Sequence, residues 1–348
     1  MAPAIKAAGA SDSASAPAPL DCGIELPYWQ AEDTRFLGPL RHAAVGNHRL
    51  AYRRIPPLYA SALPAPPLAL LLGYGQTMGA FSPRLLRALA QSREVVLYDQ
   101  PAQGLSEETD PSTDPIGLDT LAEALLGFVD ALHLGRPDLA GWSLGACLAL
   151  KLAAQHPQRI GRVVSWAGTF LDGRAVLGEP QLLAGLFNPT NTPPDYAPAF
   201  FSLRHATGRR AACRWIADLA AAPDGDDAKP ETNARYVAGI HAALQPNDLS
   251  IWQGLGRTPT PVLLMSGTAD ELIPLHAQLE LVGHIPAAWM AQFPEASHAF
   301  FLQHISRVVA TMDAFLLAET AAADDEACII GELHVRSNDA PPAAAAVA

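Results

Sequence analysis

The chain has 348 residues, of which 49% are hydrophobic and 17% are charged, and its formal net charge is -12 at pH 7. This length accommodates one large domain or two ordinary ones, each with a sizeable core. The acidic balance argues against a nucleic-acid surface and against a general binder of anionic membranes. The longest apolar runs, such as residues 68–72, are far too short to cross a bilayer, so no membrane span is expected.

The two ends of the chain differ in composition from the middle. Residues 1–34 are rich in alanine, proline and serine, which predicts a disordered leader, and residues 319–348 are expected to form a loose tail. No signal peptide is visible near the N-terminus, because the required apolar stretch is missing, so a cytoplasmic location is expected. Four cysteines lack the spacing of a metal site or of a disulfide framework, namely Cys22, Cys147, Cys213 and Cys328.

The first half of the chain alternates short apolar runs with helical patterns. Residues 41–55 form two alternating runs around Gly46-Asn47, which predicts a β-hairpin. A helix is expected to begin near Pro83, because proline is favoured in the first helical turn. Further elements follow in turn: strands over 68–72 and 94–98, a helix over 118–132, a strand over 138–142, a helix, and a strand over 162–166.

In the middle of the chain this alternation breaks. Between residues 169 and about 255 prolines cluster and helical patterns are short, which predicts a helical insert that caps the sheet. The sheet resumes with strands over 261–266 and 288–293, and a final amphipathic helix covers about 300–317. The pattern predicts an α/β fold with a doubly wound, mostly parallel sheet. We therefore expect one domain over 35–318, with its cap insert at about 169–255.

A serine lies at the turn between a predicted strand and a predicted helix. Gly141-Trp142-Ser143-Leu144-Gly145 matches the Gly-x-Ser-x-Gly nucleophile elbow. The sharp turn strains the backbone at the serine, so the residues two positions away on either side must lack bulk. Backbone amides at the helix N-terminus can then stabilise negative charge that develops beside the Ser143 hydroxyl. The alternative is a chance glycine–serine turn, and only the rest of the chain separates the two interpretations.

Two further residues complete a candidate catalytic triad. A serine alcohol is a poor nucleophile at neutral pH, so it needs a base and a group that orients the base. Asp270 and His298 each follow one of the last two predicted strands, which places both at the edge of the sheet where ligands bind. We expect Ser143 to be the nucleophile, His298 the base and Asp270 the orienting carboxylate. The alternatives are a helix cap at Asp270, an ordinary strand-end histidine at His298, and His304 as a rival base.

Two backbone N–H groups are expected to form an oxyanion hole. The first belongs to Leu144, the residue after the candidate nucleophile. The second belongs to Tyr74 in Gly73-Tyr74-Gly75-Gln76, where glycines on either side let the backbone approach a substrate. The alternative is a glycine-rich turn with no catalytic role. No metal and no cofactor are expected, because the triad supplies the chemistry by itself.

Taken together, these motifs resemble the α/β-hydrolase superfamily over about residues 41–317. The family loop usually reads His-Gly-x, whereas Leu72 occupies the histidine position here and removes a side chain that often braces the loop. Residues 95–101 resemble the 3-hydroxyacyl-carrier-protein acyltransferases, including the synthase of the rhamnolipid lipid moiety. Those transferases carry Trp-Gly after the serine and no leading glycine, so the elbow of this chain has the ordinary hydrolase form.

The resemblance implies a serine-dependent enzyme that acts on a small-molecule ester or thioester through an acyl-enzyme, hence an esterase or thioesterase. One alternative is an acyltransferase acting on 3-hydroxyacyl thioesters, in which a hydroxyl or thiol replaces water. Perhydrolases share the triad, and a non-catalytic ligand receptor with this fold is the alternative of another class. The insert carries a basic cluster that consists of Arg204, Arg209, Arg210 and Arg214. An acidic acyl carrier protein or a coenzyme A phosphate is a candidate partner for this cluster, although a solvated helix face is the simpler explanation.

Overall fold

The computed structural model describes most of the predicted domain: residues 20, 22, 35–59, 65–109, 114–169, 178, 182, 192–220, 222, 238–240, 249–286 and 288–318. The predicted tail, most of the predicted leader and parts of the predicted cap insert lie outside the described residues. Within these ranges, no helix combines the length and the apolar character that crossing a bilayer requires.

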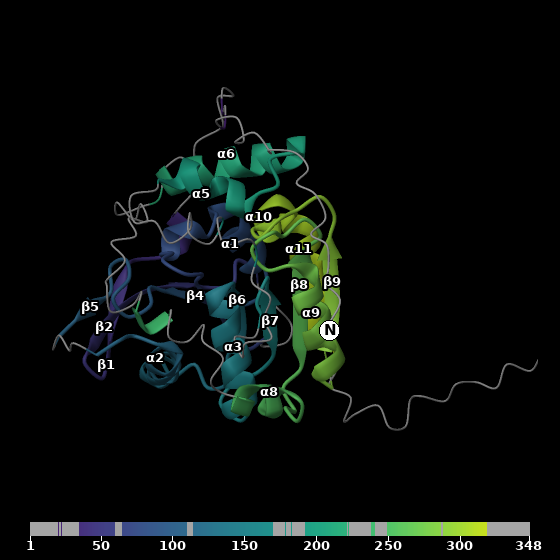
Figure 1. Cartoon of the computed structure of the whole chain (residues 1–348). Coiled ribbons are helices and arrows are strands. Elements are labelled where there is room, and N and C mark those ends of the chain that lie inside the picture. Colours follow the sequence, from purple (N-terminus) through teal and green to yellow (C-terminus); the bar gives the residue numbers. More distant parts are fainter. Residues whose placement is uncertain are drawn as a thin grey trace, which may run out of the picture.

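The described residues form a nine-stranded sheet at the centre of the molecule (Figure 1). In chain order its strands are β1 (Arg41–Val45), β2 (His48–Ile55), β3 (Leu68–Leu71), β4 (Val95–Tyr98), β5 (Glu107–Glu108), β6 (Asp138–Trp142), β7 (Val163–Trp166), β8 (Val262–Gly267) and β9 (Ala288–Phe293). They lie in the order β1-β2-β4-β3-β6-β7-β8-β9, and β5 pairs with β2. β2 pairs antiparallel with β1, β4 and β5. The remaining pairs, which run from β4 through β3, β6, β7 and β8 to β9, are all parallel. The predicted mostly parallel sheet is therefore confirmed.

The central strands are buried on both faces, which explains why they appear in the sequence as continuous apolar runs. In β3, all four side chains are buried. Leu68 and Leu70 pack into one hydrophobic cluster, and Ala69 and Leu71 pack into a second cluster on the opposite face. Because successive side chains of a strand point to opposite faces, each face needs its own layer of helices.

Helices cover both faces of the sheet (Figure 1). Side chains of α2 and α3 pack into the cluster that contains Ala69, and side chains of α1 and α11 pack into the cluster that contains Leu70. This arrangement is the doubly wound fold that the sequence predicts. The helices are α1 (Pro83–Leu89), α2 (Leu118–Ala131), α3 (Leu144–Gln155), α5 (Pro193–Phe200), α6 (Ala206–Ala220), α8 (Leu249–Leu255), α9 (Leu275–His284), α10 (Phe300–Gln303) and α11 (Ile305–Leu316), with short 3-10 turns η1 (Arg35–Leu37) and η2 (Met78–Ala80).

Helices α5 and α6, with the residues between them, form a cap over the sheet (Figure 1). The indole N–H of Trp215 on α6 donates to the carbonyl of Ala80 at 3.2 Å, and the N–H of Ala299 donates to the carbonyl of Phe200 on α5 at 2.8 Å. These two bonds attach the cap to η2 on one side and to the start of α10 on the other. The cap therefore covers the loops that follow β3 and β9.

The structure corrects the expectation for the cysteines. Cys22 and Cys213 form a disulfide that joins a residue of the predicted leader to α6 across 191 residues of sequence. Spacing along the chain does not reveal a bond that closes so long a loop. Disulfides are typical of oxidising compartments, so this bond gives no support to the expected cytoplasmic location.

The predicted final helix is also corrected, because it is divided into α10 and α11 at His304. This residue has φ -121° and ψ 39°, which is not a helical conformation. Its ring nitrogen Nε2 forms a hydrogen bond of 3.1 Å with the Pro294 carbonyl. The side-chain bond ties the break to the loop after β9.

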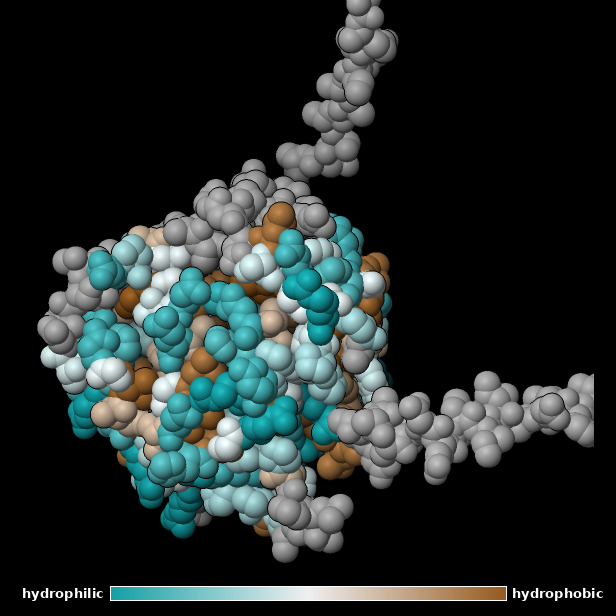
Figure 2. Space-filling model, turned by 90° about the horizontal axis from the view of Figure 1, so that it is seen from below, coloured by the Kyte–Doolittle hydropathy of each residue, from teal (hydrophilic) through white to brown (hydrophobic). Residues whose placement is uncertain are grey.

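The face of the molecule opposite the cap is mainly hydrophilic, with hydrophobic residues scattered over it (Figure 2). The exposed large hydrophobic residues also come from separate elements and include Tyr59, Leu249, Leu279, Trp289 and Leu317. Single exposed hydrophobic residues are normal on a folded protein. The exposed hydrophobic residues therefore need no functional explanation.

Candidate active site

Ser143 lies at the sharp turn between β6 and α3. Its backbone has φ 55° and ψ -114°, a conformation that is costly for a residue with a side chain. A Cβ atom added to Gly141 would lie 2.2 Å from the Gly145 carbonyl oxygen, and one added to Gly145 would lie 2.4 Å from the Leu71 carbonyl oxygen. Only glycine fits at these two positions, as the elbow motif predicts.

Asp270 and His298 meet at the carboxyl ends of β8 and β9. Nδ1 of His298 forms a hydrogen bond of 2.9 Å with Oδ2 of Asp270, and both side chains are almost completely buried. The other carboxylate oxygen, Oδ1, accepts the N–H groups of Leu272 and Ile273, each at 2.9 Å. Asp270 thus holds the loop after β8 with one oxygen and the imidazole with the other.

The ring of His298 is enclosed by two aromatic side chains. Phe200 from the cap stacks on it with ring centroids 5.9 Å apart, and Trp142 lies at the same distance at a tilt of 45°. The indole N–H of Trp142 donates to the carbonyl of His298 at 3.2 Å. Because Trp142 directly precedes Ser143, this bond joins the histidine loop to the elbow. The rival His304 instead contacts the Pro294 carbonyl and stacks on Phe293.

The loop after β3, which carries the expected oxyanion donor, packs against the elbow. A Cβ atom built on Gly73 would lie 3.6 Å from Cβ of Ser143. Tyr74 follows and is buried, and burial raises the pKa of its phenol to about 12, so this side chain stays neutral. Leu144, the other expected donor, is the first residue of α3. Leu144 is therefore next to Ser143 in the chain, and Tyr74 follows a glycine that packs against Ser143 although it is remote in sequence.

Asp99 connects the loop after β3 to its own loop after β4, a role that the sequence alone does not establish. Its two carboxylate oxygens accept the N–H groups of Met78 and Leu105, each at 2.8 Å, and its carbonyl accepts the Ser106 hydroxyl at 2.7 Å. In the sequence, this role is indicated only by the motif that begins at Asp99 directly after β4, which also contributes to the family resemblance. The contacts show why an acidic residue stands there.

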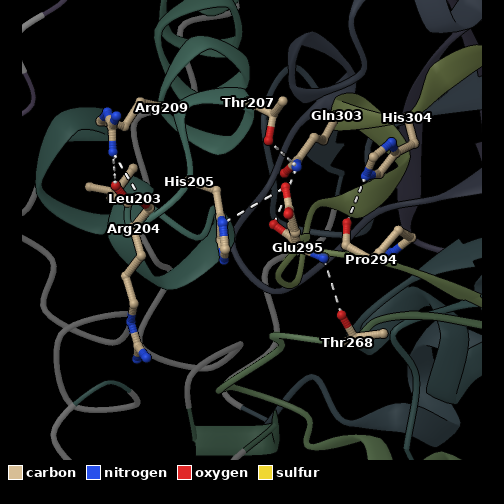
Figure 3. A network of polar contacts seen from close by, with 10 residues as sticks. All are labelled: Leu203, Arg204, His205, Thr207, Arg209, Thr268, Pro294, Glu295, Gln303 and His304. Carbon is tan, nitrogen blue, oxygen red and sulfur yellow. Dashed lines mark hydrogen bonds and ion pairs between the residues drawn. The ribbon is translucent and has the colours of Figure 1, made fainter.

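A polar network joins the cap to the loops after β8 and β9 (Figure 3). The amide of Gln303 donates to the Thr207 hydroxyl at 3.1 Å and to the Glu295 carbonyl at 3.3 Å. Nδ1 of His205 lies 3.7 Å from a carboxylate oxygen of Glu295, whose N–H donates to the Thr268 hydroxyl at 3.2 Å. The cap is therefore attached to the same two loops that carry Asp270 and His298.

The predicted cluster of four arginines is divided in the structure. Arg204 pairs with Glu271, and Arg209 donates to the carbonyls of Leu203 at 2.6 Å and Arg204 at 3.2 Å (Figure 3). Arg210 and Arg214 remain exposed on α6. All four are exposed, but Arg204 and Arg209 have the partners named above, whereas Arg214 and Arg210 act on each other electrostatically.

Arg214 lies within electrostatic reach of two other arginines. Partial burial lowers the pKa of its guanidinium, and the positive charges of Arg84 on α1 and Arg210 on α6 lower it further. Asp218 acts in the opposite direction. A local excess of positive charge therefore spans the junction of α1 and α6 in an otherwise acidic chain.

Among the described residues, no group of three or more histidine, cysteine, aspartate and glutamate side chains is placed to hold a metal ion. The remaining nucleophilic candidate near the elbow is Cys147 on α3. Its thiol donates to the Thr169 carbonyl at 2.9 Å, and burial raises its pKa to about 11. A thiol with that pKa is protonated at neutral pH, so it is a structural side chain rather than a nucleophile.

Comparison with curated proteins finds relatives with hydrolase names. The chain is 28% identical to the 2-hydroxymuconate semialdehyde hydrolase of Pseudomonas sp. strain CF600, over 74% of this chain and 89% of that one. It is 29% identical to the pimeloyl-[acyl-carrier protein] methyl ester esterase of Nitrosomonas europaea, over 72% and 95%. It is also 27% identical to the biotin biosynthesis bifunctional protein BioHC of Teredinibacter turnerae, of which it covers only 44%.

Solved structures and a family model agree on the fold. An α/β-hydrolase fold protein from Chitinophaga pinensis superposes with a TM-score of 0.64 at 20% identity, covering 82% of this chain and 99% of that one. At this identity the likeness shows the fold alone. The family model described as "alpha/beta hydrolase fold" matches residues 66–305, which is more than half of the chain. The chain therefore belongs to the α/β-hydrolase fold family.

Proposed function

We propose that the protein is a serine hydrolase that cleaves a carboxylic ester or thioester through an acyl-enzyme. The observation that carries this proposal is the buried hydrogen bond between Asp270 and His298, next to a serine held in a strained turn. A base that is oriented by a carboxylate and lies on the loop beside a nucleophile is the arrangement that serine acyl transfer needs.

In the proposed mechanism, Nε2 of His298 accepts the hydroxyl proton of Ser143 while Oγ attacks the substrate carbonyl. Asp270 accepts the hydrogen bond from Nδ1–H and stabilises the imidazolium that forms. The N–H groups of Leu144 and Tyr74 donate to the oxyanion. His298 then returns its proton to the departing alkoxide or thiolate, which leaves Ser143 acylated. Water attacks the acyl-enzyme while His298 takes up the water proton. His298 then returns this proton to Oγ of Ser143 as the acyl bond breaks, which releases the free acid and restores the enzyme.

A hydrolase is favoured over an acyltransferase for two reasons. The elbow has glycines at both ends of Gly141–Gly145, which is the ordinary hydrolase form. The relatives above carry the names of hydrolases and an esterase. The acyltransferase remains the second candidate, because residues 95–101 resemble that class. Both reactions pass through the same acyl-enzyme and differ only in whether water or another acceptor attacks it.

A substrate carried by an acidic acyl carrier protein, or by coenzyme A, is a further part of the proposal. One relative is named as an esterase of an acyl-carrier-protein ester. Arg210 and Arg214 lie exposed on the cap and share a positively charged region with Arg84. Such a region attracts an acidic partner in a chain whose net charge is -12.

The central experiment is labelling with a fluorophosphonate probe, which reacts with activated serines. The wild type is expected to be labelled at Ser143, and Ser143→Ala is expected to lose the label. Ser250→Ala on α8 is the matched control and is expected to keep it. Folded wild-type protein that takes up no label would overturn the enzyme proposal and favour a ligand receptor.

Product analysis separates the two enzyme candidates. The wild type is incubated with 3-hydroxyacyl thioesters and with nitrophenyl esters, and the products are identified by mass spectrometry. Release of free acid alone supports the hydrolase. A hydroxyacyl dimer or a thioester moved to a new thiol supports the acyltransferase, since a second acceptor has then replaced water.

A further inference from the structure

The loop that carries Tyr74 is held at both ends by the two residues that follow β4. Gln100 is completely buried, and its amide Nε2 donates to the carbonyl oxygen of Leu72 at 3.1 Å. Asp99 accepts the N–H of Met78 at 2.8 Å, where the loop enters η2. The segment between these anchors contains both Gly73 and Tyr74.

The Leu72 carbonyl lies in a confined position beside the elbow. A Cβ atom added to Gly145 in the first turn of α3 would approach this oxygen to 2.7 Å. The Leu72 side chain is buried in the hydrophobic core and carries no polar group, so it cannot brace the loop itself. The amide of Gln100, which lies in the loop after β4, instead supplies a buried hydrogen bond to the Leu72 carbonyl.

We propose that Gln100 is a positioning residue for the oxyanion hole, an inference that rests on the proposed function. Its amide fixes the peptide between Leu72 and Gly73. The following peptide, which carries the Tyr74 N–H, is part of a turn in which the Gln76 N–H donates to the Gly73 carbonyl at 3.3 Å. Because the backbone angles of glycine rotate freely, the direction of this turn relative to Ser143 depends on how the peptide before Gly73 is fixed. With the anchor in place, the Tyr74 N–H is held toward the space beside Ser143.

The size of the expected effect follows from how oxyanion donors work. Loss of one donor commonly costs roughly a hundredfold to a thousandfold in rate, and misplacement by about 1 Å costs roughly a hundredfold. Removal of the Gln100 amide loosens the donor without deleting it. We therefore expect kcat to fall by roughly tenfold to a hundredfold. KM should change little, because the donor acts mainly on the charge that develops in the transition state.

The test compares Gln100→Met with Gln103→Met. Methionine is similar in length to glutamine but cannot donate a hydrogen bond. Gln103 is a matched control, because it is a buried glutamine of the same loop whose amide donates to the carbonyl of its neighbour Ala102 at 2.8 Å. If Gln100→Met does not fold, Gln100→Leu replaces it, since leucine is smaller and also lacks the donor.

The measurements are kcat and KM on a nitrophenyl ester, the Ki of a trifluoromethyl ketone, and the melting temperature. The ketone forms a tetrahedral adduct with the serine, so its Ki reports the oxyanion hole. Active sites are counted with the fluorophosphonate probe, so that kcat refers to folded enzyme. For Gln100→Met we expect kcat to fall, Ki to rise by a similar factor, and the pH profile of kcat/KM to keep its midpoint. Gln103→Met should resemble the wild type.

Two results would overturn the role of Gln100. One is equal activity and equal Ki in the two methionine variants. The other is a lower melting temperature for Gln100→Met with unchanged kcat and Ki per active site, which indicates a purely structural residue. Failure of the proposed function is distinguishable, because a wild type that neither takes up the probe at Ser143 nor cleaves esters removes both proposals at once.

Discussion

Asp270 uses its two carboxylate oxygens for two different tasks. Oδ1 accepts the N–H groups of Leu272 and Ile273, while Oδ2 accepts the hydrogen bond of His298. From the sequence, a helix-capping role and an orienting role are alternatives for Asp270. The two N–H groups that Oδ1 accepts lie before α9, whose N-cap is Pro274, so the carboxylate holds the loop and does not cap that helix. The loop geometry and the imidazole orientation therefore depend on the same side chain.

Asp270→Asn is expected to separate these two tasks. Asparagine keeps an oxygen for the two backbone N–H groups, but its NH2 group favours the wrong tautomer of His298. In serine proteases with this type of triad such a change costs roughly 10⁴ in kcat, and we expect a loss of about 10³ to 10⁴ here. The measurement is kcat on a nitrophenyl ester. Asp130→Asn, an exposed partner of Arg159, is the control and should be neutral; equal activity in both variants contradicts the orienting role.

Cys147 is expected to resist alkylation in the native protein. Burial raises the pKa of this thiol to about 11, so protonation persists at pH 7 to 8 and the thiolate forms only as the pH approaches 11. Iodoacetamide at pH 8 should label Cys147 after denaturation but not before, as measured by peptide mass spectrometry. Rapid labelling of the folded protein at neutral pH would show that the thiol is exposed or activated.

At the scale of elements, the cap is attached to the body of the enzyme by contacts of two kinds. Phe200 stacks on His298 inside the molecule, and the Gln303 network joins the cap to the loop after β9 at the surface. The buried contact involves His298, the proposed base, whereas exposed hydrogen bonds contribute little to stability. The surface network is therefore better placed to set how the cap sits over the site than to hold the fold together.

Gln303→Ala should thus change substrate binding more than stability. We expect a several-fold rise in KM for a bulky ester, with a melting temperature close to that of the wild type, because the lost bonds are exposed. Steady-state kinetics and thermal unfolding measure the two effects. Gln253→Ala on α8 serves as the control. A large loss of stability without a change in KM would show that the network is structural.

The arginines on α6 provide a second prediction at this scale. The double variant Arg210→Ala, Arg214→Ala should have a kcat/KM for carrier-bound thioesters that is lower than that of the wild type by roughly tenfold. The difference should be smaller at high salt, because screening already removes part of the attraction in the wild type. Activity on a neutral nitrophenyl ester should not change. Arg209→Ala, whose guanidinium is occupied by backbone carbonyls, is the comparison variant. Equal loss on both substrates, or on neither, contradicts docking at this surface.

The elements themselves were largely predictable, whereas their side-chain partners were not. Strands such as β3 and β8 are short apolar runs buried on both faces, and this local signal identifies them. The elbow at Ser143 is equally local. The division of the arginine cluster involves the pairing of Arg204 with Glu271, which is remote in sequence, and the break at His304 coincides with a contact to Pro294 in the preceding loop. A single sequence contains no signal for such pairings.

At the scale of the whole molecule, the disulfide between Cys22 and Cys213 is expected to contribute to stability. Closing a long loop restricts the unfolded chain, and such bonds typically contribute about 2–4 kcal/mol to the free energy of unfolding. Reduction with dithiothreitol, or Cys213→Ser, should lower the urea midpoint accordingly. Reductant added to the Cys213→Ser variant should have no further effect. An unchanged midpoint after reduction would show that the bond does not constrain the fold.

The same bond also makes a closed covalent ring of residues 22–213. Ser143 lies inside this ring, whereas Asp270 and His298 lie on the open segment beyond it. A protease that cuts the chain once between the two cysteines therefore opens the ring but separates no fragment until a reductant is added. The proposed nucleophile and the proposed base stay on one covalently connected molecule after such a cut, so a nicked chain can keep the complete candidate triad.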